Sequence, residues 1–418
     1  MGHLGRQLLT AALTANALHP SRRGIRRGIG SFAAGWLTSE LAPHLLALTA
    51  VDTAQALARG RATRAGVALA AGSAAGLGLM VTESMRTRER LDEALEEGLG
   101  VDWAGQLDAA PSPAELATPW RQVALPFRRR DDRVEVVRNV EFAPYGRRGR
   151  LDIYRPAGRE VEDAPVLLQV HGGAWTVGTK DQQGIPLMQH LAAKGWICVA
   201  INYRLSPRNA FPAQIIDVKQ AIAWIREHIT EYGGDPGYVA ITGGSAGGHL
   251  AALAALSPGD PVYQPGFEGA DTRVQVAVPH YGYYDFAGSA GLRSSELVRD
   301  RFLGPRVVQR RFRDEPEVFE AGSPLLRVHE DAPDFLVIHG THDTMVPVAQ
   351  AREFVRRLRE VSHRAVVYAE LPGTQHAFDV FPSIRSAHVV RAVDRFLHWH
   401  WNSWRAGDDS RDTLPSTG

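Results

Sequence analysis

One glycine-rich stretch, Gly243-Gly244-Ser245-Ala246-Gly247, restricts the fold of this chain more than any other. It follows a β-type run at 238–242 and precedes an alanine-rich helical run at 247–256. A strand that turns this sharply into a helix needs glycines, because the two backbones pass too closely for side chains. The corner raises the serine hydroxyl above the sheet, beside a helix N-terminus that favours developing negative charge. The pattern indicates a nucleophilic serine, although the pentapeptide alone fits a plain glycine turn equally well.

Beyond residue 133, runs typical of strands alternate with runs of helical spacing. The run at 165–170 is continuously apolar, as expected for a strand buried on both faces of a sheet. This β–α alternation predicts an α/β fold with a mostly parallel central sheet flanked by helices. The expected strands are 134–142, 149–154, 165–170, 196–203, 238–242, 274–279, 335–339 and 365–371, and the expected helices are 186–194, 212–228, 247–256, 348–361 and 383–401.

Three regions are expected along the 418 residues. Residues 1–125 form a helical N-terminal extension, residues 126–406 form the catalytic α/β domain, and residues 407–418 form a loose polar tail. Proline-rich sequence at 109–119 marks the connection between the first two regions. The length suits one large α/β domain that carries an extension.

The extension contains two apolar segments. Residues 32–58 carry apolar side chains at spacings of three and four, which predicts a helix, although Glu40 and Pro43 interrupt it. Residues 65–81 hold no charge and would be about 25 Å long as a helix, slightly shorter than the hydrocarbon core of a bilayer. Two interpretations stay open for residues 31–82, a membrane-seated helical hairpin and a helical cap over an active site.

Further features of the extension bear on this choice. Gly72 and Gly76 have the spacing of closely packed membrane helices, and residues 83–99 continue as a polar amphipathic helix. Arginines flank both ends of the uncharged run, so their charge sets no orientation. Residues 1–30 lack a continuous apolar core followed by a small-residue cleavage site, so we expect no cleavable signal peptide.

Charge and cysteine content exclude several kinds of partner and site. The formal net charge of +1 gives no indication of nucleic-acid binding. Cys198 is the only cysteine, which excludes an intrachain disulfide and a multi-cysteine metal site. Its apolar neighbours predict a buried structural thiol.

A second glycine motif, His171-Gly172-Gly173, follows the buried strand at 165–170. Glycines at the end of a strand leave backbone N–H groups open to a cleft, with no side chain to shield them. Acyl transfer requires such donors about 2.7–3.1 Å from the oxyanion of the tetrahedral intermediate. The N–H groups of Gly172 and Gly173, together with that of Ala246 after the serine, therefore predict an oxyanion hole.

The partners of the serine are expected after two later strands. Asp343 follows the run 335–339, and His376 lies in a glycine turn after 365–371. The order serine, acid, histidine is the chain order of α/β-hydrolases, so we predict the triad Ser245, Asp343 and His376. His339 and His342 are rivals for the base, but both precede the acid in the chain. The alternative role for Asp343 is to cap the helix that follows it.

Aromatic residues and one more carboxylate surround the expected site. Trp175, Tyr281 and Tyr283 are candidates to line a substrate pocket, and the residues themselves fit a packed core equally well. Asp285 is the second choice for the acid of the triad.

Taken together, these motifs resemble the α/β-hydrolase esterases and lipases related to hormone-sensitive lipase, within the bacterial carboxylesterase branch. The resemblance covers residues 134–402 and depends on the H-G-G loop, the G-x-S-A-G-G turn and the late G-x-x-H-x-F around His376. Two departures concern substrate class: Gly244 stands where many relatives carry an acid, and Ala174-Trp175 replaces a third glycine. Residues 32–41 look like an extension carried by some bacterial members.

The resemblance implies a serine carboxylesterase or lipase that acts on a small-molecule acyl ester without a metal or cofactor. His376 would take the proton of Ser245 as the serine attacks, and Asp343 would orient the imidazole. An amidase or arylformamidase-like hydrolase with the same triad stays open, as does a catalytically silent receptor or membrane scaffold. A cytoplasmic or a membrane-associated location fits, and the sequence indicates neither acyl-chain length nor oligomeric state.

Overall fold

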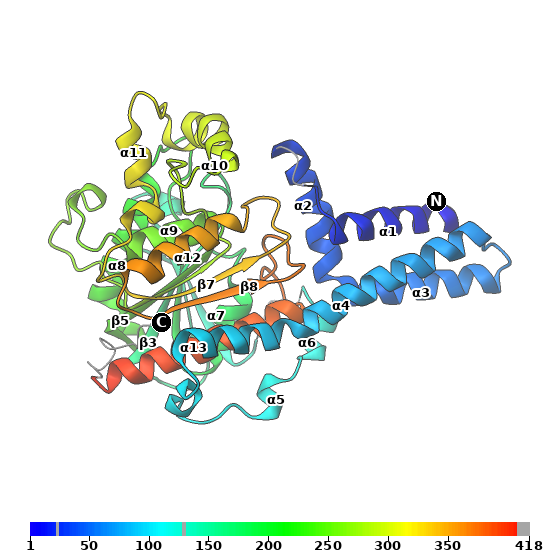
Figure 1. Cartoon of the computed structure of the whole chain (residues 1–418). Helices are drawn as coiled ribbons and strands as arrows, with labels where there is room; N and C mark the ends of the chain where they lie inside the picture. Colours follow the sequence, from blue (N-terminus) through cyan, green and yellow to red (C-terminus); the bar gives the residue numbers. More distant parts are fainter. Residues whose placement is uncertain (22–24, 128–130, 408–418) are drawn as a thin grey trace.

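An eight-stranded sheet forms the centre of the α/β region (Figure 1). The computed structural model describes residues 1–21, 25–127 and 131–407. The strand order is β1-β2-β4-β3-β5-β6-β7-β8. β2 pairs antiparallel with both β1 and β4, and all other neighbouring strands pair in parallel. The mostly parallel sheet and each expected strand are therefore confirmed. The strands are β1 (Val134–Glu141), β2 (Arg150–Pro156), β3 (Ala164–Val170), β4 (Ile197–Ile201), β5 (Gly234–Gly244), β6 (Val276–His280), β7 (Asp334–Gly340) and β8 (Val366–Leu371).

Helices cover both faces of the sheet because the side chains of its central strands are apolar on both faces. Val166 and Leu168 of β3 pack in one buried cluster with helices α8 (Ala213–His228), α9 (Ala246–Ala255) and α12 (Ala349–Val361). Leu167 belongs to the cluster on the opposite face, with α7 (Ile185–Ala193), α13 (Ile384–Arg405) and the C-terminal half of α4 (Arg64–Leu99). Apart from α4, which belongs to the extension, these helices correspond to the five expected for the domain.

A helical insertion follows β6 and was not predicted from the sequence. It contains α10 (Arg293–Val298), the π-helical segment η5 (Arg299–Val308) and α11 (Pro316–Ala321), and it rises above the sheet (Figure 1). Short helices elsewhere were not predicted either. They are η1 (Trp103–Gln106), α5 (Pro113–Leu116), α6 (Trp120–Ala124), η2 (Gly146–Gly149), η3 (Ile229–Tyr232), η4 (Pro261–Tyr263) and η6 (Pro324–Arg327).

In the described part of the N-terminal extension, four long helices precede the short ones, and their expected bounds were partly wrong. The helix predicted at 32–58 is two helices, α2 (Ile25–Glu40) and α3 (Ala42–Ala58). The break falls at Leu41 because Pro43, in the first turn of α3, has no N–H to continue the α2 ladder. α1 (His3–Leu18) was not assigned, whereas the run after 64 and the amphipathic run before 100 form the single helix α4.

α1, α3 and the N-terminal half of α4 pack together and project from the α/β body (Figure 1). The C-terminal half of α4 lies along the body, where Asp92 is 2.5 Å from Arg395 of α13. At the base of the projection, Glu40 of α2 forms a buried ion pair with Arg385 and accepts a hydrogen bond of 2.6 Å from Ser383. The extension is therefore joined to the body by a continuous helix and by a buried charge pair.

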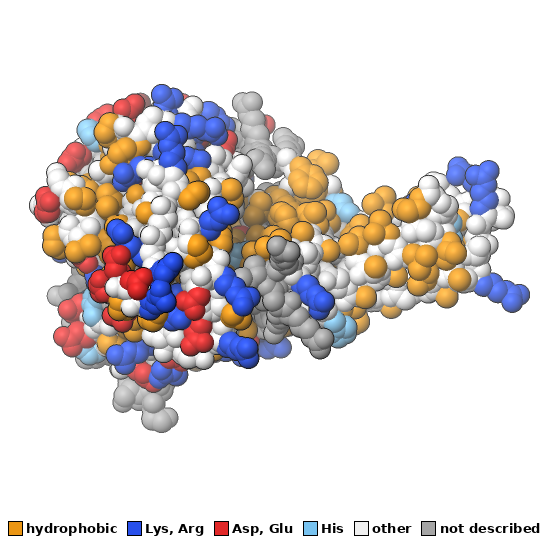
Figure 2. Space-filling view, turned by 90° about the horizontal axis from the view of Figure 1, so that it is seen from above, with side chains coloured by type: hydrophobic (Ala, Val, Ile, Leu, Met, Phe, Trp, Pro, Cys, Tyr) orange, Lys and Arg blue, Asp and Glu red, His pale blue; other side chains and the backbone are white. Residues whose placement is uncertain are grey.

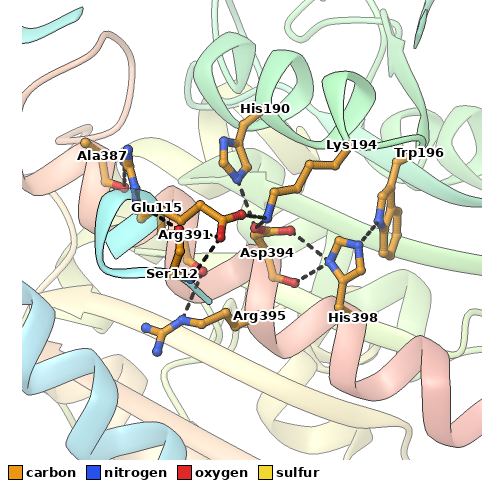
Figure 3. A network of polar contacts seen from close by, with 10 residues as sticks. All are labelled: Ser112, Glu115, His190, Lys194, Trp196, Ala387, Arg391, Asp394, Arg395 and His398. Atoms are coloured by element: carbon orange, nitrogen blue, oxygen red, sulfur yellow. Dashed lines mark hydrogen bonds and ion pairs between the residues drawn. The ribbon is translucent and has the colours of Figure 1, made fainter. Parts of the chain in front are cut away.

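A polar network further joins α13 to α7 and to the short helix α5 (Figure 3). Asp394 is its centre: one oxygen lies 2.6 Å from Lys194 and 2.9 Å from His190, and the other lies 2.8 Å from His398. Burial alone would raise the pKa of Asp394, but hydrogen bonds from the two histidines lower it well below its usual range. Glu115 of α5 contacts Lys194 at 3.5 Å.

Two further expectations concern single residues or the end of the chain. Cys198 is buried in β4 and burial raises the pKa of its thiol, which agrees with a structural role. The predicted loose tail at 407–418 lies outside the described residues except for its first residue.

Candidate active site

The sharp turn between β5 and α9 places Ser245 at the carboxyl end of the central strand. Its backbone angles, φ 60° and ψ −119°, are unusual for a residue other than glycine, and α9 begins at the next residue. A Cβ atom on Gly247 would lie 2.1 Å from the carbonyl oxygen of Val170, so no side chain fits there. Gly247 therefore lets α9 begin close to β3, the neighbour of β5 in the sheet.

The H-G-G loop after β3 lies directly against this turn. A Cβ atom on Gly172 would be 3.2 Å from Cβ of Ser245. The Gly172 N–H, however, donates a 2.7 Å hydrogen bond to Oε1 of Gln183, so this expected oxyanion donor is already engaged. Gly173 and Ala246 have no recorded partner for their N–H groups among the residues described. Sequence reasoning missed Gln183, which follows the motif by ten residues and carries no pattern of its own.

Asp343 and His376, from the loops after β7 and β8, form a direct contact. His376 Nδ1 and Asp343 Oδ2 are 2.6 Å apart, and both side chains are buried. Because the carboxyl is ionised, Nδ1 carries the proton and donates it to the carboxylate. In the described part of the chain, no hydrogen bond joins this imidazole to the Ser245 hydroxyl, and such contacts commonly tighten only when substrate binds.

Three hydrogen-bond donors hold the Asp343 carboxylate besides His376. Its Oδ1 accepts the N–H groups of Met345 at 2.8 Å and Val346 at 2.7 Å, and Oδ2 lies 3.3 Å from Nε2 of His339. Burial alone would raise the pKa of Asp343, but the charge of His376 and the bonds from His339 and His376 lower it below its usual range. The carboxylate is thus kept ionised beside the imidazole.

The rival residues have contacts of their own that differ from those of the Asp343–His376 pair. His339 supports the acid rather than replacing the base, since Nε2 also contacts the carbonyl of Val346 at 2.9 Å. His342 turns toward the carbonyl of Ala17 in the extension, at 3.3 Å. Asp285 accepts N–H groups of its own loop, from Ser289 at 2.9 Å and Ala290 at 3.0 Å.

Tyr281 connects the histidine with the serine turn. Its ring centroid is 4.6 Å from that of His376, and its hydroxyl would lie 2.5 Å from a Cβ atom on Gly244. The tyrosine therefore explains why Gly244 departs from the acidic residue of many relatives. The Tyr281 hydroxyl donates to Asp379, whose other oxygen is 2.6 Å from Nδ1 of His280. Sequence reasoning missed this second buried histidine–carboxylate pair.

Trp175 and Tyr283, the other two candidates for substrate contact, lie in an aromatic cluster. The Trp175 ring is 5.0 Å from that of Phe286 and its indole nitrogen donates to His249 at 3.1 Å. Tyr283 packs 6.3 Å from Trp175, and both side chains are buried. Contact of these two residues with substrate stays a prediction, whereas Tyr281 borders the histidine directly.

Helix α2 of the extension covers the loops that carry the acid and the histidine. The Phe32 ring meets the His376 ring edge-on at 5.8 Å, and the Thr344 hydroxyl donates to the carbonyl of Gly28 at 2.9 Å. Phe32 stacks on Trp36, which begins an apolar groove of about 150 Å³ at the junction of extension and body. Other side chains of this groove include Phe127, Ile185, Pro186 and Phe381. For residues 31–82 the sequence left two alternatives, a helical cap over the active site and a membrane hairpin. Helix α2 occupies the position of a cap, over the loops that carry Asp343 and His376.

Comparison with known proteins identifies the class to which this architecture belongs. The chain is 44% identical over 419 residues to the probable carboxylic ester hydrolase LipM of Mycobacterium tuberculosis, a match that covers 96% of this chain and 94% of that protein. The chain is an α/β-hydrolase esterase. Esterase LipQ of the same organism is 51% identical over 260 residues, covering 62% of this esterase and 61% of LipQ.

Two further similarities fall on the α/β region of the esterase. The family model BD-FAE matches residues 151–358, which include the serine turn and Asp343. Thermogutta terrifontis esterase 2, in a butyrate-bound structure, is 23% identical with a TM-score of 0.54 over 64% of this chain and 94% of its own. That likeness supports the fold. The LipM match, by its length, also reaches into the N-terminal helices of the esterase.

In the described part of the esterase, no group of three histidine, cysteine, aspartate or glutamate side chains is arranged to hold a metal ion. The Asp343–His376 pair offers one carboxylate and one imidazole, and the loops at Gly173 and Ala246 offer backbone N–H groups. These are the groups needed for proton transfer and for stabilising an oxyanion.

Proposed function

We propose that this esterase hydrolyses carboxylic esters through an acyl-enzyme on Ser245, with His376 as general base and Asp343 as the orienting acid. The contact of 2.6 Å between His376 Nδ1 and Asp343 carries the proposal, because it leaves Nε2 without a proton and able to accept one. Tyr281 also supports the proposal, because its ring lies against the imidazole while its hydroxyl approaches the serine turn at Gly244.

The reaction follows from these positions. Ser245 Oγ transfers its proton to His376 and attacks the ester carbonyl, while Asp343 stabilises the imidazolium. The N–H groups of Gly173 and Ala246 donate to the oxyanion, each contributing about 3 kcal/mol. Gly172 was also expected to donate, but its bond to Gln183 suits it to hold the loop in shape. The imidazolium protonates the departing alcohol, and a water activated by His376 releases the acid.

Substitution of the nucleophile tests this mechanism. Ser245→Ala is expected to lower kcat on p-nitrophenyl butyrate by about 10⁶-fold, because the triad acts as a unit. It should also abolish labelling by a fluorophosphonate probe while the circular dichroism spectrum stays unchanged. The control Ser112→Ala, in the capping box of α5, should retain full turnover and labelling. Turnover of Ser245→Ala within tenfold of wild type would contradict the proposal.

We also propose that the N-terminal helices associate the esterase with a membrane, as the sequence suggested for residues 31–82. The apolar run after residue 64 in α4 supports this: it is long enough to cross a bilayer, and only 33% of its 18-residue apolar window is buried. Sedimentation of cell fractions compared between the full chain and one that begins near residue 125 tests the association. Equal solubility of the two chains would count against it.

A further inference from the structure

The projecting part of the extension exposes several large apolar side chains and buries several polar ones. We call α1, α3 and residues 64–82 of α4 the arm. Leu8, Leu48 and Leu79 are 52%, 64% and 60% exposed on its outside. Figure 2 shows hydrophobic side chains along the visible face of the arm. The large apolar residues exposed on the arm are Leu4, Leu8, Leu9, Leu48, Val51, Leu57 and Leu79.

The interior of the arm has one small apolar cluster, which includes Leu77 and Met80, and otherwise holds small and polar residues. Gln7, Thr14 and Ser73 are buried between the helices, and each has a side-chain oxygen without a hydrogen-bond partner. α1 and α4 approach closely at glycines: a Cβ atom on Gly76 would lie 2.6 Å from Thr14 Cγ2. Gly72, expected to share this packing, faces open space. Small interhelical residues with apolar exteriors are typical of helices packed within lipid.

Charges on the arm occur almost entirely at its end. Residues 65–82 contain none, and as helix they extend about 27 Å, close to the hydrocarbon thickness of about 30 Å. Arg6 and Asp52 neutralise each other at 2.5 Å. Arg59, Arg61 and Arg64 are exposed at the turn between α3 and α4, where Figure 2 shows basic side chains at the tip. The length of the uncharged run therefore matches the thickness of the hydrocarbon core, and the positive charge of the tip matches the negative charge of lipid phosphates.

We propose that the three helices of the arm are embedded together in the hydrocarbon of a phospholipid bilayer, with the tip arginines at lipid phosphates. The proposal deepens the membrane association proposed above by naming the embedded surface. It includes α1, which the sequence did not indicate, and leaves out α2, which packs on the catalytic loops through Phe32 and Thr344. Because α2 lies between arm and body, embedding the arm holds the active site at the membrane surface.

A cysteine placed on the arm tests the proposal directly, since the native Cys198 is buried and leaves the new thiol as the reactive one. Leu48→Cys in the arm and Val262→Cys in the body are matched positions, each side chain being 64% exposed. Full-length enzyme labelled with an NBD fluorophore is reconstituted in vesicles of phosphatidylcholine and phosphatidylglycerol. We expect blue-shifted emission and quenching by acyl-chain nitroxides at position 48, and quenching by aqueous iodide at 262.

Equal iodide quenching at both positions in vesicles would overturn the proposal. So would full protection of position 48 in lipid-free and detergent-free buffer, because a second copy would then cover the arm.

A charge variant supplies a second measurement that separates the arm from catalysis. Leu48→Lys with Leu79→Lys places two charges on the outside of the arm without changing its interior. The double variant is expected to lower the vesicle-bound fraction at least about tenfold in flotation, since a lysine within the hydrocarbon is costly. Hydrolysis of p-nitrophenyl acetate in detergent should remain within twofold of wild type. Unchanged flotation would overturn the proposal, whereas turnover retained by Ser245→Ala, with an embedded label at 48, would reject only the catalytic assignment.

Discussion

The body buries its large apolar side chains, whereas the arm leaves several of its own exposed. In the body, Val166, Leu167 and Leu168 of β3 are fully buried between two helical layers, and polar side chains lie outside. In the arm, Leu48 and Leu57 lie outside and are more than half exposed. Burial away from water stabilises the first arrangement, whereas the second gains stability only in a medium that is itself apolar. This contrast is the basis for our proposal that the arm lies in lipid while the body lies in water.

The junction between these regions combines features of both. α2 contributes Phe32 to the surroundings of His376, and Glu40 of α2 pairs with Arg385 of α13 in a site closed to solvent. A buried pair of this kind favours one arrangement of the two regions, because any shift leaves a charge without its partner. Substitutions in the active site of the body, at this junction and in the polar network of α13 are therefore expected to have different effects on activity and stability.

The largest effect is expected where the body alone is changed. Asp343→Asn keeps the shape of the side chain but removes the charge that orients His376, so kcat on p-nitrophenyl butyrate should fall about 10⁴-fold. That loss corresponds to about 5.5 kcal/mol in the barrier. Vesicle flotation should not change, because Asp343 is bonded to His376 and to its own loop within the body.

The control for this variant is Asp285→Asn, which alters the other carboxylate considered for the triad. Asp285 bonds to Ser289 and Ala290 in its own loop, so turnover should stay within about threefold of wild type. A greater loss in Asp285→Asn than in Asp343→Asn would reverse the assignment of the acid.

A smaller effect is expected at the junction. Glu40→Gln leaves Arg385 buried without a counter-charge, which should lower the free energy of unfolding by about 3–5 kcal/mol in urea titrations. The change should also release α2 from the catalytic loops, and hydrogen exchange of residues 25–40 should rise.

The exposed pair between Glu83 and Arg86 provides the matched control for that variant. Their side chains are 41% and 59% exposed, so Glu83→Gln should change stability by less than about 1 kcal/mol. Equal stability of the Glu40 and Glu83 variants would show that the buried pair does not hold the two regions together.

Sequence reasoning succeeded where local pattern and spatial position coincide. The alternation of the strands and the glycines around Ser245 determine a backbone path, so the sheet and the serine turn were predictable. The same patterns placed Asp343 and His376 after adjacent parallel strands, and the two are in contact. Contacts made by residues with no local pattern were not predictable. Gln183 holds Gly172 across the loop, and Phe32 reaches His376 from more than three hundred positions earlier.

The arm illustrates a different limit of sequence reasoning. Hydrophobic spacing predicted helices there but could not say which side of a helix faces its neighbours. Ala- and Gly-rich helices carry apolar residues on several sides, and only the packed structure shows that Leu79 faces outward while Ser73 faces inward. The break at Leu41 likewise separates α2, which covers the site, from α3, which does not.

The smallest effect is expected in the body's polar network around Asp394 (Figure 3). Asp394→Asn should lower the free energy of unfolding by about 1–3 kcal/mol, because Lys194 and two histidines lose their shared carboxylate. The difference from wild type should depend on pH. The pKa of Asp394 is lowered by folding, so its contribution is present above about pH 4 and is lost as pH falls further.

His398 gives the network its upper pH limit. Burial opposes its charge, but hydrogen bonding to Asp394 outweighs burial and raises the pKa of His398. Its contribution is complete below the unfolded value of about 6.5 and is lost as pH rises through the higher folded pKa. Urea titrations of wild type and Asp394→Asn should therefore differ most between about pH 4 and 6.5. Asp108→Asn, on the exposed surface, should show no such maximum, and a pH-independent difference for Asp394→Asn would mean that packing rather than charge sustains the network.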